Sequence, residues 1–398
     1  MALSNNNISN HSIISLFLVF FFFGCSNASS STINVVSFGA RPDGMWDSTL
    51  PFLRAWSWAC KSIEETTIYV PKGSFLLKQI TLWGPCKKKI TFRMDGTLVA
   101  PLDYWSLGNS GYWILFMKVN GISIYGGTLN ARGASYWDCR RAAKNCPPGA
   151  RSISFSWSNG VVVSGLTSLN SQTIHIAVDH CENVRIENVK IRAPSRSPNT
   201  DGINVQFSRG VTITYATIMT GDDCISINQG SSHLWIDHIA CGPGHGISIG
   251  SLGNYVREEG VENVTVTSST FTKSENGVRI KSLAQPSNGY TKGIQFRNLI
   301  MKNVYNPIII DQRYCPKPTS CPRQNSGVKI SGVRYEDIKG TSASEVAINL
   351  DCSASNPCWG IILRDIKLRY VKGSATSSCR NAAGTASGVV IPRSCLSN

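Results

Sequence analysis

The chain has 398 residues, 42% of them hydrophobic, which is enough to bury a large core in one long domain or in two ordinary ones. Charged residues make up only 16%, and 39 Lys and Arg against 24 Asp and Glu leave a net charge of +15. This balance argues against a basic partner and favours an acidic one, such as nucleic acid, anionic lipid or an acidic polysaccharide.

The N-terminus is typical of a secretory signal peptide, which we place at 1–29. The segment 13–23 is apolar apart from Ser15 and runs into small residues at 24–28. It is well below the roughly 20 residues that a membrane span needs. The first ten residues contain no Lys or Arg, so an uncleaved anchor is the alternative. We expect a secreted, extracellular protein that binds neither membrane nor nucleic acid, which leaves an acidic polysaccharide as partner.

Fourteen cysteines in a secreted chain indicate disulfides. If Cys25 leaves with the signal peptide, short separations allow six pairs and leave Cys181 as a buried free thiol. A zinc site is not expected, because no CxxC pair with an answering His or Cys pair occurs. The six pairs are Cys60 with Cys86, Cys139 with Cys146, Cys224 with Cys241, Cys315 with Cys321, Cys352 with Cys358, and Cys379 with Cys395.

The first predicted element of the mature chain is a helix over 49–64. Phe52, Leu53, Trp56 and Ala59 recur there at helical spacing, and we assign them to the core and not to a ligand site.

From about residue 159 the chain repeats a phrase of two short β-rich runs separated by a polar break, as in RGVTITYATIMTGDDCISIN and SHLWIDHIACGPGHGISIGS. A period of roughly 20 to 35 residues is typical of a solenoid. Alternating Ile and Val within the runs predict strands, and segments long enough for helices are absent here. We therefore predict an all-β parallel β-helix whose open end is capped by the helix 49–64. A β-propeller is the alternative fold, but the repeats are shorter than its blades.

Polar residues fall in register at the start of one run in consecutive coils. The aligned tripeptides are Asp201-Gly-Ile, Asp223-Cys-Ile, His245-Gly-Ile and Asn276-Gly-Val. Equivalent positions on neighbouring coils lie about 4.8 Å apart, so these side chains should stack along one edge, with Asp222 beside them. Residues alternate inward and outward beyond that edge. The matching outward positions hold Asn204 and Gln206, Ser226 and Asn228, Ser248 and Gly250, and Arg279 and Lys281.

This cluster suits the hydrolysis of an acidic sugar polymer. Cleaving a glycosidic bond needs a proton donor for the leaving oxygen and a second carboxylate on the other face of the sugar. Three neighbouring acids cannot all ionise cheaply, so one should keep its proton at mildly acidic pH. Of the Asp222 and Asp223 pair, we expect one to remain an acid and the other to stay charged. Arg279 can bind a carboxylate through two hydrogen bonds and Lys281 adds a point charge, which favours a sugar acid.

Four motifs in this order resemble the signatures of the polygalacturonases, glycoside hydrolase family 28. They are Asn199-Thr200-Asp201, Gly221-Asp222-Asp223, Gly244-His245-Gly246 and Arg279-Ile280-Lys281. VVSFGARPDGMWDST, near the expected mature N-terminus, is similar to the plant branch. The resemblance runs from about residue 33 to the C-terminus and implies one catalytic domain over 33–398.

The resemblance implies a right-handed parallel β-helix that hydrolyses α-1,4-galacturonan in pectin with inversion and without a metal. We expect no cofactor and a monomer. By motif, Asp222 would be the general acid, and His245 would maintain the ionisation and orientation of that acid. Asp201 and Asp223 would position and deprotonate the water molecule. Asn199, Arg279, Lys281 and Tyr314 would bind substrate. The family pattern also supports the pairing of Cys224 with Cys241. Ser-Leu-Ala-Gln at 282–285 and Asn-Gln at 228–229 depart from the common plant pattern, which leaves the subsite preferences open.

Two other functions fit part of the pattern. A pectate lyase is one alternative, in which Ca²⁺ would be held by Asp201, Asp222 and Asp223 and Arg279 would be the base. A lyase mechanism gives no role to His245 among the acids, however. A non-catalytic wall protein could hold pectin on a basic face, although carboxylates in the cleft would weaken such binding. Asn263-Val264-Thr265 is the one N-glycosylation sequon after the signal.

Overall fold

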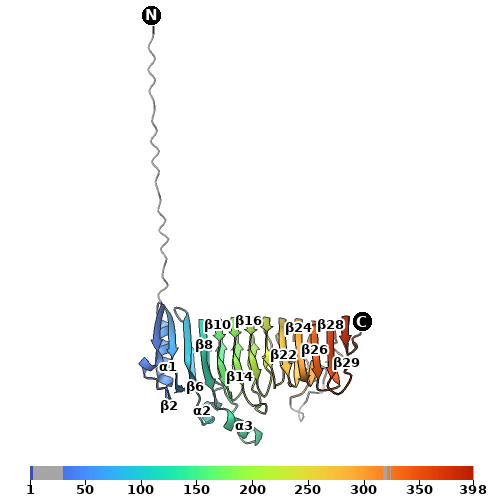
Figure 1. The fold of residues 1–398 in the computed structure, drawn as a ribbon, viewed down its shortest axis with the longest axis horizontal. Coiled ribbons are helices and arrows are strands. Elements are labelled where there is room, and N and C mark those ends of the chain that lie inside the picture. The colour runs from blue at the N-terminus through green and yellow to red at the C-terminus, as the bar shows by residue number, and fades with distance from the viewer. Residues whose placement is uncertain (3–29, 317–320, 323, 398) are drawn as a thin grey trace.

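The computed structural model describes residues 1–2, 30–316, 321–322 and 324–397. The predicted signal peptide at 1–29 lies almost entirely outside the described residues. The remainder winds into an elongated solenoid, and Figure 1 shows the strands of successive coils side by side from the N-terminal to the C-terminal end. The β-propeller alternative is therefore wrong.

Every strand pairing recorded between the named strands is parallel, and the described strands form two sheets. Sheet B carries one strand per coil: β5 (Ile80–Trp83), β7 (Tyr112–Met117), β9 (Arg151–Ser156), β12 (Ile176–Asp179), β15 (Ile203–Gln206), β18 (Ile225–Ile227), β21 (Ile247–Leu252), β23 (Asn276–Leu283), β25 (Asn306–Tyr314), β27 (Val346–Asp351) and β29 (Thr376–Arg380). Sheet A contains β1 (Ser30–Asn34), β2 (Asp43–Asp47), β3 (Glu65–Val70), β4 (Ser74–Leu76), β6 (Ile90–Val99), β8 (Asn120–Asn130), β10 (Asn159–Ser164), β11 (Thr167–Leu169), β13 (Glu182–Glu187), β14 (Lys190–Arg192), β16 (Arg209–Thr214), β17 (Thr217–Met219), β19 (Ser232–Asp237), β20 (Ala240–Cys241), β22 (Val261–Thr272), β24 (Tyr290–Val304), β26 (Lys329–Ser342), β28 (Cys358–Tyr370) and β30 (Ala382–Ile391).

Each central coil crosses sheet A in two runs separated by a bend. The first run is β10, β13, β16 or β19, and the second is β11, β14, β17 or β20. In β22, β24, β26 and β28 both runs belong to one strand. A residue with positive φ marks the bend in each of these long strands, namely Ser268, Asn298, Asp337 and Asp365. The solenoid therefore has three faces: sheet B, the first run and the second run.

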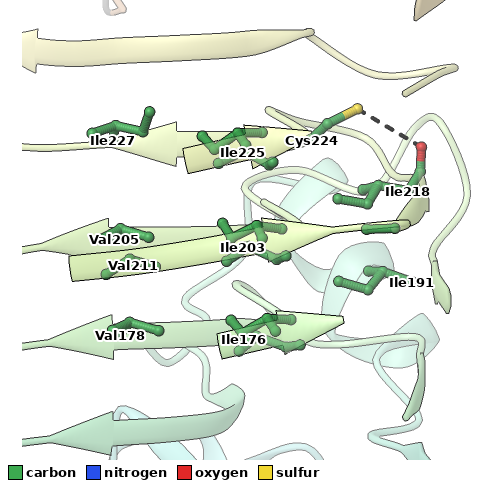
Figure 2. Packing of buried hydrophobic residues seen from close by; sticks show 14 of the residues in the cluster. Ile176, Val178, Ile191, Ile203, Val205, Val211, Ile218, Cys224, Ile225 and Ile227 are labelled. Carbon is green, nitrogen blue, oxygen red and sulfur yellow. Dashed lines mark hydrogen bonds between the residues drawn. The ribbon is translucent and has the colours of Figure 1, made fainter. Parts of the chain in front are cut away.

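Stacked aliphatic side chains fill the interior, as the alternating pattern predicts. Ile176, Ile203 and Ile225 occupy register-equivalent positions on β12, β15 and β18, and each is fully buried. Figure 2 shows this column next to a second one formed by Val178 and Val205 together with Ile227. Each coil thus contributes to one continuous core.

Helix α1 (Thr49–Lys61) is found where the sequence predicts one, although it ends three residues before the expected boundary because Ser62 adopts an extended backbone. It lies at the N-terminal end of the solenoid (Figure 1). Trp56 stacks on Phe92 with ring centroids 6.1 Å apart and donates from its indole N–H to the Trp83 carbonyl at 2.9 Å. These residues are core, as expected, while the capping role of the helix stays a prediction. The other helices are a 3-10 helix, η1 (Val35–Phe38), and two in connections, α2 (Trp105–Gly108) and α3 (Ala134–Arg141).

All six predicted disulfides are present, and Cys181 is a buried free cysteine. Asn263 is exposed on β22. Among the described residues, no helix has the length and apolar character that crossing a membrane would take.

Candidate active site

The register of sheet B confirms the alignment of the polar tripeptides. Ile203 pairs with Ile225, Ile225 with Ile247, and Ile247 with Val278. The residues two positions earlier, Asp201, Asp223, His245 and Asn276, are therefore stacked at the start of four consecutive strands. The outward row that follows is also confirmed, since Asn204, Ser226, Ser248 and Arg279 are register partners.

The turn that carries the two adjacent acids is fixed by close packing. A Cβ at Gly221 would lie 2.0 Å from the carbonyl oxygen of Ser197 on the preceding coil, so only glycine fits there. The Gly221 N–H donates to Thr200 Oγ1 at 3.0 Å. On the other side, the Cys224 N–H donates to the Gly246 carbonyl at 2.7 Å, and the disulfide to Cys241 adds a covalent brace. The turn is held between its two neighbouring coils.

Asp223 is the buried centre of an ion-pair group. Only 1% of the residue is exposed. Arg279 Nη2 donates to Asp223 Oδ1 and Lys281 Nζ donates to Asp223 Oδ2, both at 2.8 Å. Ser248 Oγ donates to Asp223 Oδ1 at 2.8 Å and accepts from Arg279 Nε at 3.0 Å. Two cations share one carboxylate, so the group retains a positive charge that suits an anionic sugar.

Asp222 faces His245 instead. The Asp222 Oδ1 to His245 Nδ1 distance is 3.1 Å, and His245 Nε2 lies 3.4 Å from Glu275 Oε2. The histidine is thus placed between two carboxylates. Asn199 Nδ2 lies 3.5 Å from Asp222 Oδ2, which brings the first motif to the same acid.

The Asp222 and His245 side chains favour the ion-paired form. Burial tends to raise the pKa of Asp222, but the hydrogen bond and positive charge of His245 outweigh it and lower that pKa. Burial tends to lower the pKa of His245, but the hydrogen bond and charge of Asp222, with the charge of Glu275, raise it above its ordinary value. The two groups titrate as one pair, and their shared proton belongs to the pair and not to either residue.

A second proton is held at Asp201. Burial and the negative charges of Asp222 and Asp223 raise the pKa of Asp201 to about 7, although a hydrogen bond from Ser226 Oγ to Asp201 Oδ2, at 2.6 Å, opposes this rise. From sequence we expected the proton to remain on one of the two adjacent acids. The structure favours Asp201 because its neighbours are carboxylates, whereas Asp222 and Asp223 each have a cationic partner.

The structure brings all eight predicted site residues to this face. Tyr314 lies at its border, with Lys281 Nζ 5.0 Å and Arg279 Cζ 5.6 Å from the ring centroid. Sequence reasoning missed two contacts. Ser248 bridges Arg279 and Asp223, although it was placed only as an outward position. Glu275 was not considered, although it precedes Asn276 as Asp222 precedes Asp223, and this offset was a usable signal.

The donor atoms of the cluster fit a calcium ion poorly. Asp222, Asp223 and His245 each present one ligand atom within 4.8 Å of the others. Calcium takes six to eight oxygen ligands, however, and one of these three donors is a nitrogen. Both oxygens of Asp223 already accept hydrogen bonds from Arg279 and Lys281, whose positive charges repel a further cation. The site thus supports acid and base chemistry better than metal binding.

Comparison with known proteins agrees with this geometry. The model of the glycosyl hydrolases family 28 matches residues 60–389. A polygalacturonase of Prunus persica is 52% identical over 391 residues, which cover 98% of this chain and 100% of that relative.

Solved structures share the fold. An endo-xylogalacturonan hydrolase from Aspergillus tubingensis superimposes with a TM-score of 0.79 at 24% identity, covering 90% of this chain and 100% of that one. Endopolygalacturonase I from Stereum purpureum, solved with two galacturonates, has a TM-score of 0.62 at 22% identity and covers 82% and 95% of the two chains. The family match over residues 60–389 and the 52% identical relative show that the chain belongs to glycosyl hydrolase family 28.

Proposed function

We propose that the protein is a polygalacturonase that hydrolyses the α-1,4-galacturonosyl linkages of pectin by an inverting acid and base mechanism. The observation that carries the proposal is a convergence of side chains in a family 28 chain: three carboxylates and a histidine from the turns before β15, β18 and β21 meet two buried cations on β23. The family match and the 52% identical polygalacturonase support the substrate class.

Substrate binding falls to the cations of the cleft. Arg279 and Lys281, each about 6% exposed, are fixed by Asp223 and leave one positive charge not neutralised. A galacturonate carboxylate meets this charge in a largely desolvated place, where an ion pair is stronger than in water. Tyr314 and Asn199 border the same space and would orient the sugar.

Asp222 acts as the proton donor. Its pair with His245 carries one proton at mildly acidic pH, and the bound sugar removes further water from Asp222, which favours the neutral acid. Asp222 then transfers the proton to the glycosidic oxygen as the bond to the anomeric carbon breaks. His245 keeps the donor oriented and supplies the proton of the pair.

Asp201 and Asp223 act on the water molecule. Asp201, protonated below about pH 7, can donate a hydrogen bond to the water oxygen. Asp223, ion-paired with Arg279 and Lys281, accepts the water proton as the oxygen attacks the anomeric carbon from the face opposite the leaving group. Inversion of that carbon follows from attack on the opposite face.

We further propose that the chain is secreted into the cell wall after removal of residues 1–29, that 33–398 form one catalytic domain, and that Asn263 can carry a glycan. The net charge of +15 and the exposure of Asn263 support these assignments.

The test is incubation of the purified protein with polygalacturonic acid at mildly acidic pH, with and without a Ca²⁺ chelator. New reducing ends and the absorbance of unsaturated products are followed together. Reducing ends that survive the chelator and appear without unsaturation are expected. Chelator-sensitive unsaturated products would show a lyase and overturn the mechanism, and binding without any products would favour a non-catalytic wall protein.

A further inference from the structure

The outer face of sheet A distributes its charges unevenly between the two runs. On the first run, four cations are paired with acids of the same or the next coil, although the exposed Arg209 and Lys329 are not paired with any described residue. The pairs are Arg185 with Glu187 at 3.4 Å, Lys292 with Glu262 at 2.7 Å, Arg334 with Glu336 at 3.6 Å, and Arg364 with Glu336. This is the ordinary arrangement of a solvated sheet surface, in which both signs are interspersed.

The second run lacks such compensation. Four exposed cations, here called the basic band, lie on three consecutive coils: Lys302 on β24, Lys339 on β26, and Lys367 and Arg369 on β28. Within the described residues none of the four makes an ion pair. From β11 to β28, the outward positions of the second run contain no Asp or Glu. The same run also carries the exposed Lys190 and Arg192 further toward the N-terminus.

The band places like charges directly opposite each other. Lys339 and Lys367 are register partners on β26 and β28, and Arg369 is two residues further along the same strand. Directly opposed like charges destabilise a sheet. Asp337 and Asp365 lie two residues before these lysines, at the bends, but neither is ion-paired with them. The first run interleaves acids with its cations, whereas the second run carries exposed cations without acids, and such a surface suits an anion from outside.

We propose that the basic band is a second, non-catalytic binding surface for an extended polyanion, the de-esterified galacturonan of the wall. Such a polymer carries a carboxylate on every sugar and so offers repeated negative charge along a line, as the band offers repeated positive charge along the solenoid axis. The partner's identity rests on the proposed function, whereas the existence of an anion-binding surface does not.

The band is distinct from the cleft. The band lies on the outer face of sheet A. The proposed catalytic residues lie in the turns that lead into β15, β18 and β21 of sheet B, and in the described part of the chain no hydrogen bond or ion pair joins them to the band. Its cations are exposed, while Arg279 and Lys281 are buried. Binding at the band should therefore be weak per contact, additive over several contacts and strongly reduced by salt, because exposed charges are screened over about 10 Å at 0.1 M ionic strength. It would hold the enzyme on its substrate between cleavage events without taking part in them.

The test compares two charge reversals of equal size. Lys339→Glu with Lys367→Glu changes the band, and Lys87→Glu with Lys88→Glu changes two exposed lysines of a turn outside it. Both double variants also carry Asp222→Asn, so that the polymer is not cleaved during the experiment. Retention of each protein on a polygalacturonate gel is then measured at increasing salt concentration. The same pairs on the native background are assayed with short, soluble galacturonate oligomers, and thermal unfolding confirms that each variant folds.

We expect the band reversal to weaken retention by about tenfold at 0.1 M salt and the turn reversal to change it by less than about twofold. Both double variants should hydrolyse the soluble oligomers at the native rate. On a gel of fully methyl-esterified pectin, which has no free carboxylates, the two variants should be retained equally. Equal losses for the two reversals would show that total charge alone matters, and no loss for either would show that the band binds nothing; each result overturns the proposal. If the native enzyme cleaves no galacturonan, the proposed function fails, while the retention assay still tests the band.

Discussion

Replacing Glu275 by Gln should move the alkaline limb of the pH profile to lower pH. Glu275 Oε2 lies 3.4 Å from His245 Nε2, and its negative charge helps to keep the shared proton on the pair of His245 and Asp222. Two unit charges at this distance in water interact by about 1 kcal/mol. Because the Glu275 side chain is 52% exposed, we take about half of that energy, about 0.5 kcal/mol, which corresponds to about 0.4 pH unit.

The assay is kcat/KM on polygalacturonate from reducing ends, measured between pH 4 and pH 8. This parameter reports the protons of the free enzyme, and the pair must be protonated to act, so rates fall as pH rises through the pKa of the pair. The activity of the variant should fall at a pH about 0.4 unit lower than that of the native enzyme, and this difference should shrink at high salt. Glu345→Gln, an exposed acid with no contact to His245, serves as the control. A limb that stays in place, or moves to higher pH, would refute the assigned role of Glu275.

Three further changes test the energetics of the fold and the site. Lys281→Met should lower the free energy of unfolding, measured by urea titration, by about 3 kcal/mol, because the buried Asp223 loses one of its two cationic partners. A loss below about 1 kcal/mol would contradict this account of the ion pair. His175 is fully buried and burial lowers its pKa to about 3, so the unfolded chain takes up its proton first. Lowering the pH from 6.5 to 4.5 should therefore cost the native protein about 2 to 3 kcal/mol more than it costs His175→Asn, and equal pH dependence of the two urea midpoints would disprove this. The Tyr335 hydroxyl is buried and finds no hydrogen-bond partner among the residues that the structure describes. Tyr335→Phe should therefore raise the free energy of unfolding by about 1 kcal/mol, and a lower melting temperature would argue against this.

The sequence was a good guide wherever the repeat itself sets the geometry. Alternating Ile and Val define the inward positions, and the fixed offset from Ile203, Ile225 and Ile247 places the polar tripeptides in one stack. The disulfide pairs could be predicted for the same reason, because short separations along a coil keep cysteines close. The helices α2 and α3 were not predicted, since they lie in connections outside the repeating pattern.

The distribution of protons in the site could not be predicted from the register. The protonation state of each carboxyl group depends on whether a cationic side chain lies beside it. The directions of the side chains decide this, and the order of residues in the sequence does not. Both Arg279 and Lys281 reach Asp223, and His245 reaches Asp222, so the carboxyl left among negative neighbours is that of Asp201. The serine hydroxyl of Ser248 completes the ion-pair group through a contact that a residue pattern does not encode.

The central claim is that Asp222 donates the proton that releases the leaving sugar. Asp222→Asn keeps the size of the side chain and removes its acid. The decisive measurement is its rate of reducing-end formation on polygalacturonate at mildly acidic pH, together with its binding to the same polymer. We expect the rate to fall by about a hundredfold or more while binding is retained. A rate within about threefold of the native enzyme would contradict the assignment of Asp222 and the mechanism built on it.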